Sequence, residues 1–187
     1  MDKLKEGITL YHGSYCVVDN IDLSKCHRGK DFGRGFYLTT SYEQAVKFIR
    51  LSVKNAVNVG TLKEEVQVGF VNAYRLELAN VINEFDFQEA DVNWLHFVAG
   101  NRDEELFRDL LEEFSKYNVI GGKIANDRTA ATLSQYVNGT FGNPGDIEAD
   151  EIAIKLLLPN RLEDQYCFRN DEATACLHFK NAEEVPV

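Results

Sequence analysis

The apolar positions of the chain alternate like strands at both ends and recur with helical spacing in the middle. The strand-like segments are short, and several of them end at glycine or at a polar residue. Strands are predicted over residues 8–11, 36–38, 66–78, 119–124, 165–168 and 176–179. Helices are predicted over residues 41–58, 90–98, 104–117, 128–137 and 147–158. Early strands, central helices and late strands are typical of an α+β fold rather than a doubly wound sheet.

Two of the predicted helices begin at residues that can cap them. Ser41 can cap the helix that follows it, and Pro159 ends the last one. Asn126 or Asp127 can cap the helix that starts at Arg128, and the alternative is that Asp127 and Arg128 face a substrate. The apolar helix around residues 90–98 is interpreted as core.

Composition favours one domain over residues 1–187 and argues against a broad nucleic-acid-binding face. The chain has 187 residues, of which 44% are hydrophobic, and a net charge of −10. Binding to a phosphate backbone needs clustered basic residues, which an acidic chain lacks overall. One basic cluster does precede the strand at 36–38, namely Lys25, His27, Arg28, Lys30 and Arg34. It is either a solvated loop or a clamp for a diphosphate.

The cysteines and the amino-terminal residues point to a reducing compartment. Cys16, Cys26, Cys167 and Cys176 have no Cys-x-x-Cys spacing and no histidine at zinc-ligand distance, so we expect free thiols and no metal. The first residues are charged and contain no signal peptide, and no apolar run is long enough to span a membrane. We therefore expect a cytoplasmic protein. No Gly-x-Gly-x-x-Gly opens a helix after a strand, so a Rossmann site for NAD is not indicated.

Two short segments carry polar and aromatic residues where a plain core strand would carry Val or Ile. The first strand ends in His12-Gly13-Ser14, and the second is entered through Gly33-Arg34-Gly35 and contains Tyr37. Glycines at a strand start indicate a turn or bulge that re-aims a side chain. A histidine and a tyrosine beside such glycines predict a pocket for a planar, hydroxyl-rich ligand. The alternative for His12 is a strand-end histidine bonded to a backbone carbonyl.

These segments resemble the ADP-ribosyltransferase superfamily of the His-Tyr-Glu type, to which diphtheria toxin and the poly-ADP-ribose polymerases belong. Phe32-Gly-Arg-Gly-Phe-Tyr-Leu38 is similar to the Phe-Gly-Lys-Gly-Ile-Tyr-Phe signature of those enzymes, and His12-Gly13-Ser14 is similar to their His-Gly-Ser. The whole chain resembles a bacterial family of uncharacterised ADP-ribosyltransferase-like domains. The resemblance implies a split β-sheet with flanking helices, and NAD as the donor substrate without a metal.

The resemblance also assigns roles to individual residues. His12 would bond ribose hydroxyls, the backbone of Gly13 would bind the nicotinamide carboxamide, and Tyr37 and Phe48 would sandwich the nicotinamide ring. The alternative for the two aromatic residues is ordinary core packing. The implied NAD-binding residues are His12, Gly13, Ser14, Arg34, Gly35, Phe36, Tyr37 and Phe48, and the implied catalytic residues are His12, Tyr37 and Gln165.

The third catalytic position departs from the family pattern. Relatives often place a glutamate there, on a late strand, whereas the matching block Glu163-Asp-Gln-Tyr-Cys-Phe168 offers Gln165. A glutamine accepts the ribose hydroxyl bond without a charge, which would weaken transition-state stabilisation by about one or two kcal/mol. Ala45 is a second departure, where many relatives have a serine that bonds the carboxamide.

The function expected from the resemblance is transfer of one ADP-ribose unit from NAD to an acceptor. A protein acceptor is favoured over nucleic acid, and analogy adds a bacterial toxin or modifier that a small antitoxin-like partner restrains. One alternative is a catalytically degenerate module that binds NAD or an ADP-ribose-like ligand. Another is NAD hydrolysis, in which water is the acceptor.

Overall fold

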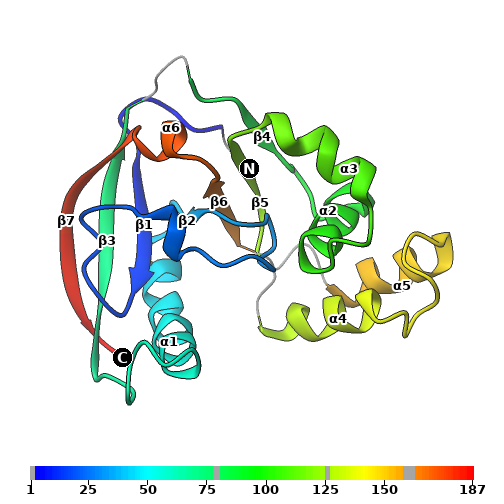
Figure 1. The fold of residues 1–187 in the computed structure, drawn as a ribbon, viewed down its shortest axis with the longest axis horizontal. Helices are drawn as coiled ribbons and strands as arrows, with labels where there is room; N and C mark the ends of the chain where they lie inside the picture. Colours follow the sequence, from blue (N-terminus) through cyan, green and yellow to red (C-terminus); the bar gives the residue numbers. More distant parts are fainter. Residues whose placement is uncertain (1–2, 78–80, 125–126, 158–162) are drawn as a thin grey trace.

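Two small β-sheets form the centre of the protein, and helices cover their outer faces (Figure 1). The structure, a computed structural model, describes residues 3–77, 81–124, 127–157 and 163–187. The first sheet has the antiparallel order β1-β3-β7, and the second has the order β2-β6-β5-β4, in which only β4 and β5 run parallel. Their strands are β1 Thr9–Ser14, β2 Phe36–Leu38, β3 Val68–Leu76, β4 Glu84–Asp86, β5 Val119–Lys123, β6 Asp164–Phe168 and β7 Leu177–Pro186.

The helices divide between the two sheets. Helix α1 packs against β1 and β3, and helices α2 to α5 pack around the second sheet. Their bounds are α1 Tyr42–Asn58, α2 Val92–Arg102, α3 Arg108–Glu113, α4 Asp127–Val137, α5 Ile147–Leu157 and α6 Asp171–Thr174, with 3-10 turns at Leu23–Lys25 and Phe114–Lys116. Two sheets flanked by helices confirm the predicted α+β class.

Burial explains this arrangement. A cluster between the two sheets includes Leu10, Phe36, Tyr74 and Phe168. A second cluster lies between the second sheet and the helical layer, with the fully buried Trp94 of α2 near its centre. Because residues 94–100 of α2 are buried, apart from the partly exposed His96, the apolar residues of this helix follow no single stripe. Over the described residues, none of the helices combines the length and the apolar character needed to cross a membrane.

Local sequence signals set several of the element boundaries. The Ser41 hydroxyl accepts the Gln44 N–H, so the predicted cap of α1 is confirmed. The predicted helix over residues 104–117 is shorter than expected. Phe107 adopts a left-handed conformation (φ 52°) immediately before α3 and thereby separates it from the preceding turn. Residues 78, 126 and 158–159, on which predicted strand and helix ends fell, lie outside the described residues.

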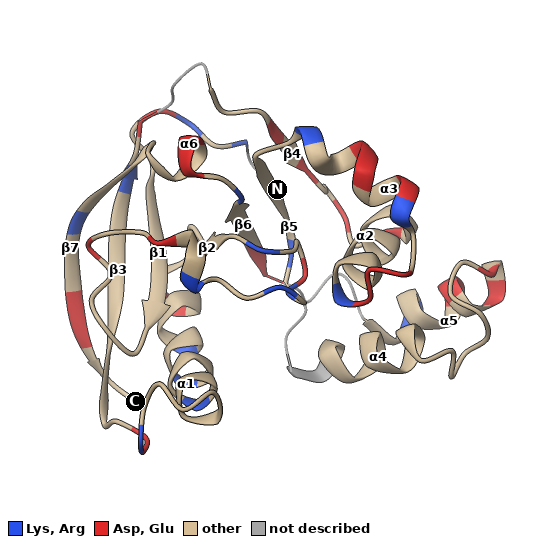
Figure 2. Ribbon diagram, viewed as in Figure 1, with Lys and Arg blue, Asp and Glu red and all other residues tan. Residues whose placement is uncertain are grey.

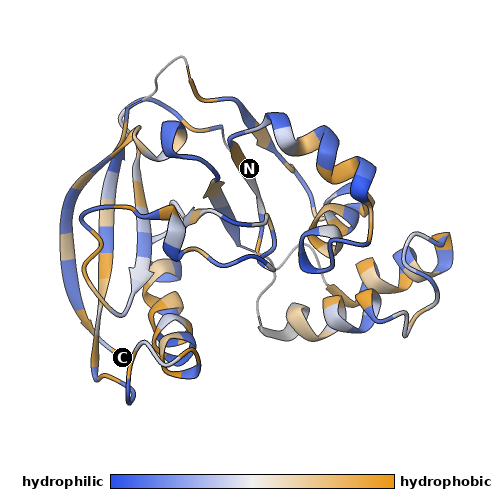
Figure 3. Cartoon of the chain, viewed as in Figure 1, coloured by the Kyte–Doolittle hydropathy of each residue, from blue (hydrophilic) through white to orange (hydrophobic). Residues whose placement is uncertain are grey.

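Acidic and basic residues are distributed unevenly over these elements. Acidic residues are spread over β7, α3 and α5, whereas α1 carries most of its charge as Lys and Arg (Figure 2). Strand β7 is hydrophilic along most of its length (Figure 3), in keeping with its position at the edge of the first sheet.

Candidate functional site

Among the described residues, one isolated backbone bridge joins the two sheets. Tyr11 and Thr39 exchange both backbone hydrogen bonds, at 2.8 and 3.0 Å. Continuing this antiparallel register would place Gly13 opposite Tyr37, but no such pair forms among the described residues. Instead, the imidazole of His12 reaches across, and its Nδ1 lies 2.8 Å from the Tyr37 carbonyl oxygen. The backbone pairing of β1 with β2 therefore stops at this bridge, and we call the unpaired interval beyond it, between Gly13 and Tyr37, the gap.

The hydrogen bond of His12 fixes the state of its ring. A carbonyl oxygen can only accept, so Nδ1 carries the proton and donates it to the Tyr37 carbonyl. Burial lowers the pKa of His12, although the bond to the carbonyl acts in the opposite direction, and the neutral ring is favoured. The ring packs on Phe36 with 4.4 Å between centroids. In this tautomer Nε2 is an acceptor, and no described residue bonds to it. The expected strand-end contact therefore exists, but it uses only one of the two ring nitrogens.

Gly13 lies at the closest approach of β1 to α1. A Cβ at this position would stand 1.9 Å from the Ala45 carbonyl oxygen and 3.2 Å from the Ile49 nitrogen, so only glycine fits. Backbone hydrogen-bonding groups alternate between the two edges of a strand. Because Tyr11 bonds toward β2, the N–H and C=O of Gly13 point to the same side, into the gap. Gly13 thus packs against a helix and presents its backbone to the candidate site.

Asn72 shapes the chain that leaves β1, and the sequence reasoning missed it. Its side chain is fully buried on β3, accepts the Val18 N–H at 2.8 Å, and donates to the carbonyls of His12 and Cys16 at 3.3 and 3.2 Å. The available signal was an asparagine inside an otherwise apolar strand. The hydroxyl of Ser14 accepts the Cys16 N–H at 3.4 Å within the same turn.

Tyr37 closes the loop that precedes its own strand. Its hydroxyl donates to the Gly33 carbonyl at 2.7 Å and accepts the Phe32 N–H at 2.9 Å. Burial, followed by the charges of Cys167 and Asp31, raises the pKa of Tyr37 well above its usual value, so the hydroxyl remains a donor. The Tyr37 ring stacks on Phe32 at 6.5 Å between centroids.

Phe48, the other predicted half of the aromatic sandwich, lies half-buried on α1. It makes no ring contact with another described aromatic residue. Both aromatic roles therefore stay predictions.

Fold requirements account for the glycines of the second motif. Gly33 has φ +80°, and a Cβ there would also lie 2.6 Å from the Asn101 side-chain oxygen. A Cβ at Gly35 would lie 2.4 Å from the Cys167 sulfur and 2.7 Å from the Phe168 carbonyl oxygen. The two glycines let the loop turn and then approach β6 closely. They position Tyr37 whether or not a ligand binds.

Gln165 lies on β6, next to β2, with only 5% of its surface exposed. Its Nε2 donates to Asp31 Oδ2 at 3.2 Å, and Asp31 Oδ1 pairs with the Arg102 guanidinium at 2.7 Å. The neighbouring carboxylates bind elsewhere, because Glu163 pairs with Lys47 at 3.0 Å and Asp164 pairs with a lysine of β5. Of Glu163, Asp164 and Gln165, only Gln165 is buried. Asp31 and Arg102 were not predicted, since they lie far from Gln165 in the sequence.

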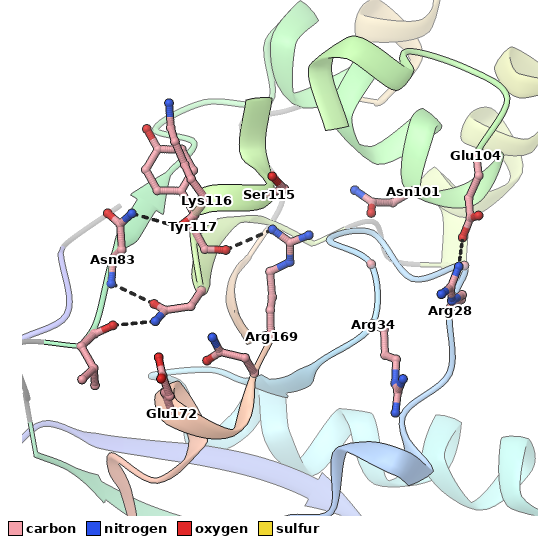
Figure 4. A pocket seen from close by; sticks show the side chains of 15 residues that line it. Arg28, Arg34, Asn83, Asn101, Glu104, Ser115, Lys116, Tyr117, Arg169 and Glu172 are labelled. Atoms are coloured by element: carbon pink, nitrogen blue, oxygen red, sulfur yellow. Dashed lines mark hydrogen bonds and ion pairs between the residues drawn. The ribbon is translucent and has the colours of Figure 1, made fainter. Parts of the chain in front are cut away.

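A cavity of about 560 Å³ opens beside the loop that carries the predicted diphosphate clamp (Figure 4). Arg28 and Arg34 line it from this loop, and Lys116 and Arg169 line it from the opposite wall. His12, Tyr37 and Gln165 do not belong to its lining. This cavity is thus adjacent to the candidate site but distinct from it.

The arginines of this cavity are engaged with protein groups. Arg28 pairs with Glu104 at 2.9 Å, and the guanidinium of Arg34 donates twice to the Leu23 carbonyl at 2.8 and 3.1 Å. Arg169 donates to two backbone carbonyls of the 114–117 turn at 2.9 and 3.1 Å. Figure 4 shows Arg34 turned away from Arg169. The role of Arg34 as a phosphate ligand stays a prediction.

Comparison with known proteins yields one family. No curated protein and no solved structure matches the chain. The model of the family described as "Protein of unknown function (DUF3990)" matches residues 8–179, a range that includes both motif segments, Asp31 and Gln165. Since this match covers most of the 187 residues, the chain belongs to the DUF3990 family.

Proposed function

We propose that the protein is a mono-ADP-ribosyltransferase that transfers ADP-ribose from NAD to a macromolecular acceptor. The observation that carries the proposal is the divergence of β1 and β2 beyond the Tyr11–Thr39 bridge. It brings His12, the backbone of Gly13 and the backbone carbonyl of Tyr37 together, with Gln165 on the strand next to β2. The resemblance assigns these four residues to NAD binding and catalysis.

The groups that face the gap suit the two polar parts of the nicotinamide riboside. The neutral His12 ring offers Nε2 as an acceptor for a ribose hydroxyl, while Nδ1 holds the ring in place. The N–H and C=O of Gly13 match a carboxamide, which has one acceptor and one donor to satisfy. Ala45 contributes no hydroxyl to this contact.

The chemistry needs orientation and electrostatics from the protein. The bond between the anomeric carbon and the nicotinamide nitrogen breaks, nicotinamide leaves with the electron pair, and an acceptor nucleophile forms the new bond and loses its proton. Tyr37 limits the orientation of the nicotinamide ring, and Gln165 accepts a ribose hydroxyl bond. No step requires a metal.

A binding module without catalysis is the second candidate. Gln165 supports it, because this residue is uncharged and only 5% exposed. Ala45 supports it too, because it lacks the serine hydroxyl of many relatives. An NAD glycohydrolase, which uses water as the acceptor, would need the same binding groups.

Nicotinamide release from NAD, followed by NMR, separates these candidates. We expect release by the wild type, a decrease of about tenfold or more in His12→Ala, and little change in the control His178→Ala. His178 is exposed on β7 and pairs with Glu77, away from the gap. Labelled NAD then distinguishes transfer, which leaves label on a macromolecule, from hydrolysis. Saturable NAD binding without release would support the binding module, and the absence of both would refute the proposal.

The proposal extends to the setting of the reaction. The acceptor is a protein rather than a nucleic acid, because the chain carries a net charge of −10. The protein acts in the bacterial cytoplasm as a toxin or modifier, restrained by a small antitoxin-like partner. The toxin role and the antitoxin-like partner follow from the resemblance alone.

A further inference from the structure

A buried carboxylate lies next to the third catalytic position, where the sequence offers only an amide. Asp31 is 9% exposed and bonds Gln165 through Oδ2 and Arg102 through Oδ1. It immediately precedes the Phe32–Leu38 motif, yet it lies 134 residues from Gln165 in the sequence. The fold thus brings a negative charge to a position that otherwise lacks one.

The contact with Asp31 fixes the orientation of the Gln165 amide. A carboxylate only accepts hydrogen bonds, so the NH₂ group of Gln165 must face Asp31 and its carbonyl oxygen must face the other way. A freely rotating glutamine could present either group to a ligand. Here the acceptor oxygen is the group left for a ribose hydroxyl.

Besides burial, the negative charge of Asp31 raises the pKa of two neighbouring groups, Tyr37 and Cys167. It contributes, after burial and Cys167, to the raised pKa of Tyr37. It also contributes to the pKa of Cys167, which burial raises to about 12. Arg102 reaches Asp31 from the last turn of α2, and this ion pair offsets the cost of burying the carboxylate.

We propose that Asp31 is the positioning residue of Gln165 and carries the negative charge that the third position itself lacks. The proposal rests on the proposed function. As the bond to nicotinamide breaks, positive charge develops on the ribose, and a hydrogen bond to an amide polarised by a carboxylate is stronger than one to a free amide. Where many relatives carry the negative charge on a glutamate at the third position, this chain therefore carries it on Asp31, which bonds Gln165.

A charge swap tests the contact directly. In Gln165→Glu two carboxylates meet in a buried site, and we expect a melting temperature lower by about 5–10 °C at pH 8. Repulsion raises the pKa of such a pair, so one carboxyl takes up a proton at lower pH. The melting temperature of the variant should therefore lie closer to that of the wild type at pH 5. In the double variant D31N/Q165E, the new amide at position 31 still accepts from Arg102 through its oxygen, and its NH₂ donates to the new carboxylate at position 165. This variant keeps the net charge and should recover most of the lost melting temperature.

Nicotinamide release by the same variants tests the role of the charge. We expect Asp31→Asn to lower kcat about tenfold or more with a smaller change in KM, and the double variant to regain most of kcat. Asp164→Asn is the matched control. Asp164 lies on β6 beside Gln165, but its carboxylate pairs with Lys123. Its replacement should leave kcat within about twofold of the wild type.

Each outcome bears on a separate part of the proposal. Additive losses of melting temperature, without recovery in the double variant, would overturn the contact. Recovery of stability with an unchanged kcat in Asp31→Asn would overturn the charge role. If no variant releases nicotinamide, the proposed function and the charge role both fail, whereas the melting temperatures still decide whether Asp31 holds Gln165.

Discussion

The hydroxyl of Tyr37 should stabilise the fold independently of any ligand. In Tyr37→Phe the Phe32 N–H loses its acceptor at 2.9 Å and the Gly33 carbonyl loses its donor at 2.7 Å. Phe32 is fully buried, so water cannot replace the lost acceptor without a rearrangement of the loop. A buried polar group left unsatisfied costs about 1–3 kcal/mol. We therefore expect the free energy of unfolding to fall by about 2 kcal/mol.

Urea denaturation can measure this change through the fluorescence of Trp94, the one tryptophan of the chain, which is fully buried. Tyr117→Phe is the matched control, because no described residue bonds the Tyr117 hydroxyl, and its stability should change by less than about 0.5 kcal/mol. A Tyr37→Phe variant as stable as this control would refute the reasoning. Because burial raises the pKa of Tyr37 well above 10, its folded state binds more protons in alkali, and wild-type stability should fall as the pH rises beyond 10.

Three further predictions concern the first sheet, the second sheet and the thiols. Gly13→Ala should destabilise the protein by about 3 kcal/mol in urea, because the new Cβ meets the Ala45 carbonyl and backbone cannot yield as a side chain can. Burial and the charge of Glu84 raise the pKa of Asp86 to about 7, so the folded state binds more protons than the unfolded state between pH 4 and 7. Asp86→Asn should therefore stabilise the protein at pH 8 and have little effect at pH 4, which thermal unfolding at both pH values can check; equal effects at both would contradict it. Mass spectrometry after iodoacetamide treatment should find the partly exposed Cys16 and Cys26 alkylated before the buried Cys167 and Cys176, and equal labelling would contradict the burial.

Most elements of the fold could be predicted, because their signals are local. The cap at Ser41 and the apolar spacing of α1 and α5 lie within single windows of sequence. Strand β4 was missed because it has three residues and two of them are acidic. Strand β7 was predicted to end at Phe179 but continues to Pro186. Its charged residues face solvent along the edge of the sheet, where pairing with β3 rather than burial defines the strand.

The candidate site was only partly predictable for the same physical reason. His12, Gly13 and Tyr37 lie in motifs whose residues are adjacent in the sequence. Asp31 and Asn72 act across strands, on partners far along the chain, and neither has a local pattern that reveals its partner. Arg34 lies in a motif, yet its guanidinium binds the Leu23 carbonyl. A motif therefore predicts a strand and its backbone geometry better than it predicts the direction of a flexible side chain.

Packing alone explains several motif residues, so these residues are not evidence for a binding site. Gly33, Gly35 and the hydroxyl of Tyr37 are all required by the loop and by the approach of β2 to β6. Two groups remain that the described fold does not use, namely Nε2 of His12 and the backbone edge of Gly13. The backbone edge of Gly13 faces β2 beyond the Tyr11–Thr39 bridge, where a strand edge would ordinarily pair with its neighbour. The His12 ring donates to the Tyr37 carbonyl in place of that pairing, and the Nε2 atom of the same ring remains an acceptor without a partner among the described residues.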